Sequence, residues 1–153
     1  MRTTQDLMEF ALRVIDHGLE TLGGVNIGVG LMGPAGLDRL VTLAGPDLAF
    51  RQSTAVKEVR EARAEGWLDG VVHIDVGWTA PHRPSDTRRP SERPDCREVV
   101  FIFAYGEDGK SVAVVDVDRD DRGVRRGQLT DLTAAKHVNW LDQAFDSAPT
   151  GTA

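Results

Sequence analysis

Apolar residues follow two different spacings along this chain, and each spacing predicts a different kind of element. Over residues 4–22 they recur with helical spacing, which predicts an amphipathic helix that ends at Gly23, because glycine takes the left-handed conformation without steric cost. A second helix is predicted over residues 52–65, with Ser53 as its N-terminal cap and Gly66 at its end. Each helix is expected to pack one side against a sheet.

Strand spacing dominates the middle of the chain. Residues 71–78 alternate between two faces, and residues 99–105 are apolar on both faces, which is typical of an interior strand. A tight turn at residues 106–109 leads into a third strand over residues 111–118. A charged connector follows, and helical spacing then predicts a last helix over residues 131–145.

Residues 25–44 fit a β-hairpin. A strand over residues 25–31 leads through a turn at residues 33–36 into a return strand over residues 39–43. Pro34 supports the turn, because proline presets the backbone angle that tight turns need. The hairpin is the interpretation that we favour for this segment.

An alternative for the same segment is a nucleotide phosphate site. Gly28, Gly30 and Gly33 spell G-x-G-x-x-G, and the phrase GVGLMGPAG resembles the dinucleotide fingerprint of the 3-hydroxyacid dehydrogenase family. That resemblance implies a strand, a loop and a helix whose N-terminus holds the phosphates. A full buried strand should precede the motif, but only Val25–Ile27 stand between the first helix and Gly28.

The order of elements, α-β-β-α-β-β-β-α, predicts a two-layer α+β domain with a mostly antiparallel sheet of about five strands covered by helices. A chain of 153 residues fits a single domain, which we place over residues 1–147. Residues 79–96 are rich in proline and arginine and predict a mobile loop. Residues 148–153 are expected to form a disordered tail.

Composition narrows the classes of function and the compartment. A net charge of −6 argues against nucleic-acid binding, which draws on cationic side chains to neutralise phosphates. The single cysteine, Cys96, excludes an internal disulfide and a cysteine-based zinc site, so a reducing cytoplasm is expected. The chain has no apolar run long enough to span a bilayer, and we expect no membrane association.

His73 and Asp75 are the candidate catalytic residues, because they share one face of the strand over residues 71–78. An imidazole beside a carboxylate can act as an oriented general base. The loop over residues 79–96 would then act as a lid. No metal site and no cofactor are predicted from the residues.

Two functions from different classes remain open at this point. The first is a non-catalytic binding or accessory protein that acts through a protein partner or self-association, which Trp78 and Trp140 favour because tryptophan is enriched at interfaces. The alternative is a small enzyme or small-molecule binding domain that uses His73 and Asp75, or the glycines from Gly28 onward. The sequence leaves the oligomeric state and the ligand undecided.

Overall fold

The computed structural model describes residues 1–80 and 83–146 and consists of one sheet with helices on both faces. Its helices are α1 (Thr4–Leu22) and α2 (Leu48–Glu65), with short 3-10 turns η1 (Pro90–Glu92), η2 (Thr133–Ala135) and η3 (Trp140–Ala144). Its strands are β1 (Gly28–Gly33), β2 (Gly36–Thr42), β3 (Gly70–Thr79), β4 (Arg97–Gly106), β5 (Gly109–Asp120) and β6 (Gly123–Asp131).

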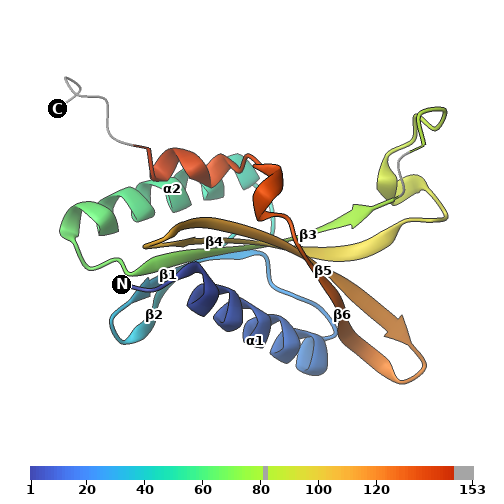
Figure 1. The fold of residues 1–153 in the computed structure, drawn as a ribbon, viewed down its shortest axis with the longest axis horizontal. Helices are drawn as coiled ribbons and strands as arrows, with labels where there is room; N and C mark the ends of the chain where they lie inside the picture. The colour runs from blue at the N-terminus through green and yellow to red at the C-terminus, as the bar shows by residue number, and fades with distance from the viewer. Residues whose placement is uncertain (81–82, 147–153) are drawn as a thin grey trace.

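All neighbouring strands are antiparallel, in the order β2-β1-β3-β4-β5-β6. The two long helices lie on opposite faces of this sheet, α2 together with η3 on one face and α1 on the other (Figure 1). The predicted α+β class with an antiparallel sheet is confirmed, although the sheet has six strands instead of five. No helix in the described ranges is long and apolar enough to cross a membrane.

Helix α1 has the predicted bounds, and its ends show why. Thr3 accepts a hydrogen bond from the Asp6 N–H, and Asp6 accepts one from the Thr3 N–H, so the pair forms a capping box. At the other end Gly23 has φ 68°, in the left-handed region. Between them the buried side chains of Leu7 and Ile15 hold the helix against β3 and β4.

Helix α2 begins earlier than predicted, at Leu48 instead of residue 52. Asp47 is the N-terminal cap, with φ 61° and no side-chain hydrogen bond, so Ser53 lies inside the helix and the predicted cap is wrong. The apolar stripe that predicts this helix does not extend into its first turn. Leu48 and Phe50 lie off that stripe and are 50% and 72% exposed. The predicted end at Gly66 is confirmed by its φ of 82°.

The middle strands agree with the predicted pattern. Residues 25–44 contain the β1–β2 hairpin, so the hairpin interpretation is confirmed and the strand-loop-helix does not form. Its strands are shifted from the predicted ranges, because β1 begins at Gly28 instead of residue 25 and β2 at Gly36 instead of residue 39. Strand β4 lies between β3 and β5, and its residues are buried on both faces, as with Val99 and Val100, each 1% exposed. Because the two helices cover opposite faces, a strand in this position needs apolar side chains on both.

The predicted last helix over residues 131–145 is wrong. The charged connector instead extends β5 to Asp120 and returns as β6, the sixth strand. This hairpin is largely exposed, so its sequence lacks the apolar alternation that marks a strand. The following segment makes two 3-10 turns, because Lys136 takes φ 52° and interrupts any continuous helix. Of its apolar residues, Leu141 and Ala144 are buried and Val138 is 90% exposed.

Substituting Gly106 by alanine is expected to lower the free energy of unfolding by about 1–3 kcal/mol. A Cβ on Gly106 would lie 2.7 Å from the carbonyl oxygen of Arg2 and 2.7 Å from the N–H of Thr4, and backbone atoms cannot move aside cheaply. Urea unfolding of the variant measures the change. Gly24→Ala is the matched control, because a Cβ there meets no atom within 4 Å. Equal midpoints for the two variants would contradict the prediction.

Candidate functional site

The predicted pair His73 and Asp75 lies on β3, on the sheet face that carries α2 and η3. His73 is 1% exposed; its ring stacks on Phe103 with centroids 5.3 Å apart, and Trp140 meets it edge-on at 5.1 Å. The side chain of Asp75 is 41% exposed, and its nearer oxygen lies 3.8 Å from His73 Nε2. The imidazole is therefore sealed from solvent, whereas the carboxylate lies at the margin of the core.

A chain of hydrogen bonds starts at the buried His73 and ends at the partly buried Lys110. The side-chain amide of Asn139 lies 2.9 Å from His73 Nδ1 and donates to the Tyr105 hydroxyl over 3.0 Å. Tyr105 donates in turn to Asp142 over 2.8 Å, and Lys110 Nζ donates to the other oxygen of Asp142 over 3.0 Å. This network, which we call the His73 network, joins three adjacent strands to the segment around η3.

The donors in the network decide the protonation state of His73. An amide nitrogen can only donate, so His73 Nδ1 accepts from Asn139 and the neutral ring carries its proton on Nε2. Burial lowers the pKa of His73 to about 4, so the ring is neutral at pH 7. Neither ring nitrogen then offers a free lone pair to a substrate. This arrangement suits a structural tie better than a general base.

The pKa values of Tyr105 and Asp142 are shifted in the directions that keep the hydroxyl protonated and the carboxyl ionised. Burial and the hydrogen bond to Asp142 raise the pKa of Tyr105, which keeps its hydroxyl protonated. Burial opposes ionisation of Asp142, but hydrogen bonds from the Asn139 N–H, Lys110 and Tyr105 outweigh it and lower the pKa of that carboxyl. Burial also raises the pKa of Asp75, against a backbone hydrogen bond that works the other way. The charge of the Asp142 carboxylate is compensated by Lys110, whose Nζ lies 2.8 Å away.

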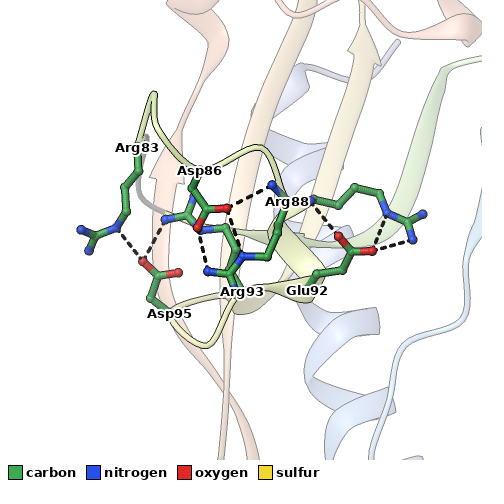
Figure 2. A network of polar contacts seen from close by, with 7 residues as sticks. Arg83, Asp86, Arg88, Glu92, Arg93 and Asp95 are labelled. Carbon is green, nitrogen blue, oxygen red and sulfur yellow. Dashed lines mark hydrogen bonds and ion pairs between the residues drawn. The ribbon is translucent and has the colours of Figure 1, made fainter.

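The described part of the loop over residues 79–96 is organised by paired charges (Figure 2). Arg93, 7% exposed, lies between Asp86 and Asp95, 3.4 Å and 2.9 Å from their carboxylates. Hydrogen bonds from Arg88 lower the pKa of Asp86. Because these arginines already bind carboxylates, an anionic ligand would have to displace the carboxylates of Asp86 and Asp95. The predicted mobility of the loop stays a prediction, and residues 81–82 lie outside the described ranges.

The described part of this loop does not cover His73. It begins after Thr79, the last residue of β3, and six residues of strand correspond to roughly 20 Å along the sheet. Figure 1 shows the loop projecting beyond the end of the β3–β4 hairpin, away from α2 and η3. The side chain that closes over His73 is instead Trp140, from the C-terminal segment.

The three glycines of the G-x-G-x-x-G motif lie within β1, where Gly28 and Gly30 pair with both β2 and β3, and Gly33 pairs with β2. Gly28 and Gly30 face the α1 side, where an added Cβ would lie 3.3 Å from Leu40 and 3.1 Å from Leu37. Gly33 faces the opposite side, where a Cβ would lie 3.3 Å from Trp67. The glycines therefore leave room for neighbouring side chains, and strand pairing occupies the backbone around them.

A second candidate site, which the sequence does not indicate, surrounds the outer strand β2. Leu37 and Leu40 are 48% and 59% exposed on the α1 side, where they form a hollow of about 110 Å³ with Phe10 and Val14 over the glycines of β1. On the opposite side Phe50, from α2, lines a wider hollow of about 420 Å³. We call these five residues the β2-edge surface. Exposed apolar side chains that are grouped together are typical of protein–protein contact surfaces, whereas single exposed ones are common on any protein.

Sequence reasoning missed most residues of both sites. Tyr105 carried the one available signal, because a tyrosine in a strand buried on both faces needs a partner for its hydroxyl. Asn139 and Asp142 fell within the predicted last helix, where nothing indicated contact with His73.

Comparisons with known proteins do not assign this chain to a family. No protein-family model matches the chain, and neither a curated protein nor a solved structure matches it. Within residues 1–80 and 83–146, no group of three or more histidine, cysteine, aspartate or glutamate side chains is placed to hold a metal ion. The function must therefore be argued from the two sites themselves.

Proposed function

We propose that this protein is a non-catalytic binding or accessory protein that acts through protein–protein contacts. The observation that carries the proposal is the β2-edge surface, where Leu37, Leu40 and Phe50 are 48%, 59% and 72% exposed around one outer strand. Burying such side chains against another protein removes apolar area from water, which is the main driving force of association. A cytoplasmic location is part of the proposal and rests on Cys96 as the single cysteine.

The state of His73 supports the same proposal. Its ring is enclosed, its Nδ1 accepts from Asn139, and its Nε2 carries the proton. A small-molecule reaction at His73 and Asp75 would require Trp140 to move away first. The His73 network thus supports a framework role, in which it holds the C-terminal segment against β3, β4 and β5.

A thermal-shift screen against nucleotides, divalent metals and phosphorylated metabolites tests the proposal. We expect no shift, whereas a specific ligand at about 100 times its Kd would add roughly 2.7 kcal/mol of stability. Any ligand that does shift the midpoint is retested on His73→Gln and Asp75→Asn. Stabilisation that both substitutions abolish would overturn the proposal in favour of the small enzyme.

Capture experiments test the positive side of the proposal. Wild-type protein and Leu40→Glu are immobilised in parallel, and proteins retained by the wild type alone are purified and titrated against both. Leu40 is 59% exposed, so the substitution should leave the fold intact while it places a charge in the contact. We expect at least one purified partner to bind the wild type about tenfold or more tightly than the variant. Equal binding to both proteins would remove the β2-edge surface from the proposal.

A further inference from the structure

Strand β2 is an outer strand of the sheet, and within the described residues it pairs with β1 alone. On its other edge the carbonyl of Thr42, at the end of the strand, accepts from Arg51 over 3.3 Å, and the backbone groups nearer the bulge can accept another strand. The opposite outer strand, β6, is protected differently. Its Arg125 and Arg126 are exposed ion-pair partners of Asp120 and Asp16, at 2.6 Å and 2.9 Å, so charge covers that edge. Charged side chains on an edge oppose pairing with a second sheet, and β2 has apolar ones beside its charges.

A β-bulge interrupts the usual alternation of side chains between the two faces of β2. Leu31 pairs with Arg39 while the next residue of β1 pairs with Leu37, so Asp38 is an extra residue in β2. Leu37 and Leu40 consequently lie on the same face, above the glycines of β1.

The two charged residues between those leucines lie together on the opposite face. Arg39 lies over the ring of Trp67 at 5.4 Å, and the Asp38 carboxylate is 3.6 Å from Arg39 Nε. The strand thus presents leucines on one face and an acid–base pair on the other. Each hollow of the β2-edge surface lies beside one of these faces.

This arrangement is complementary to itself. If two β2 strands run antiparallel about a two-fold axis between Asp38 and Arg39, then Asp38 of each copy lies opposite Arg39 of the other. In the same register Leu37 of each copy lies opposite Leu40 of the other, so leucine meets leucine on the α1 side. Side chains directly opposite across an antiparallel pair are close enough to interact, and opposite charges there are favourable. An isologous contact requires this kind of self-complementarity.

We propose that the β2 edge binds a second copy of this chain, so that two six-stranded sheets join into one continuous sheet across a two-fold axis. The inference rests on the proposed function, because it names the partner of the β2-edge surface. The two-fold places Val14 and Phe50 of each copy beside the added strand, one on each face. This widens the contact beyond the strand itself, as stable interfaces of about 1,200–2,000 Å² require.

Sedimentation velocity over the micromolar range tests the pairing. We expect wild-type protein to form a dimer and Leu40→Glu to weaken it by about tenfold or more, because a charge would be buried against leucine. Val138→Glu is the matched control, since Val138 is 90% exposed on the C-terminal segment, on the side of β5 and away from β2, and it should leave the dimer unchanged. A thermal melt of each variant confirms that it is folded before it is compared.

A charge-exchange cycle tests the register. Asp38→Arg would oppose two positive charges across the axis and Arg39→Asp two negative charges, so each alone should weaken the dimer by about tenfold. The double variant D38R/R39D restores opposite charges in both positions and should recover the wild-type association. Both residues are exposed, so these changes should leave the monomer fold intact.

The outcomes separate this inference from the proposed function. A monomeric wild type, a Leu40→Glu dimer of wild-type strength, or a double variant no stronger than the single ones would overturn the two-fold pairing. The proposed function would still stand if a purified partner distinguished wild type from Leu40→Glu. A dimer that follows the whole cycle supports the pairing even if the capture experiments find no other protein.

Discussion

Lowering the pH from 7 to 4 is expected to cost this protein roughly 3 kcal/mol of unfolding free energy through His73 alone. Burial lowers the pKa of His73 from 6.5 to about 4 in the folded protein, whereas the unfolded chain keeps the ordinary value. Between these two values the unfolded chain binds a proton that the folded protein does not. The stabilisation is therefore complete above about pH 6.5 and is lost as the pH falls toward 4.

The groups that face His73 modify the size of this effect. Asp75 lies 3.8 Å away, and burial raises the pKa of its carboxyl, so Asp75 favours the folded state as the pH falls and partly offsets His73. Burial raises the pKa of Tyr105, so its hydroxyl stays protonated and does not change charge in this window. Comparison of variants is needed to isolate the histidine.

Urea unfolding at a series of pH values between 4 and 7 measures the loss. His73→Gln keeps an acceptor for Asn139 but cannot be protonated, so we expect it to remove most of the slope attributable to His73. His17→Gln is the matched control for the substitution itself, because that ring is exposed on α1 and lies outside the His73 network. The prediction fails if wild type and His73→Gln lose stability in parallel.

Asn139→Leu is expected to lower the free energy of unfolding by about 2–4 kcal/mol at pH 7. Asn139 is 6% exposed, and its amide satisfies His73 Nδ1 and the Tyr105 hydroxyl at once. Leucine has a similar volume but no donor, so His73 Nδ1 would be left buried without a partner. A buried acceptor that loses its donor pays its full desolvation penalty.

Two readouts separate this tie from general damage. Urea unfolding gives the overall loss, and limited proteolysis should cut Asn139→Leu within the segment around η3 before it cuts the sheet. Val138→Ala is the matched control in the same segment, and its 90% exposed side chain should cost less than about 0.5 kcal/mol. If Asn139→Leu and Val138→Ala are equally stable, the His73 network does not hold the segment.

Local periodicity was enough for the elements with one clearly apolar face. The bounds of α1 follow from its apolar stripe and Gly23, and the β1–β2 hairpin follows from its turn residues. Strand β6 could not be predicted from apolar alternation, because it is exposed on an outer edge and carries ion pairs such as Arg125–Asp120 instead. The last helix was predicted from spacing that residues 131–145 do possess, but Lys136 breaks the backbone there.

The candidate sites show the same division more sharply. The sequence placed His73 and Asp75 on one strand face, because side chains two residues apart in a strand point the same way. Only the tertiary structure brings Asn139 to His73, 66 residues away along the chain, and so decides that the ring is neutral and enclosed.

By itself the sequence determined the α+β class, the hairpin and the central strands, because helical and strand periodicities are properties of neighbouring residues. The tertiary structure decided the sixth strand, the His73 network and the β2-edge surface. Each of these depends on which segments meet across the sheet, and on a bulge at Asp38 that sets two leucines side by side. Contacts between distant segments leave little trace in local spacing, so they became visible only in the folded chain.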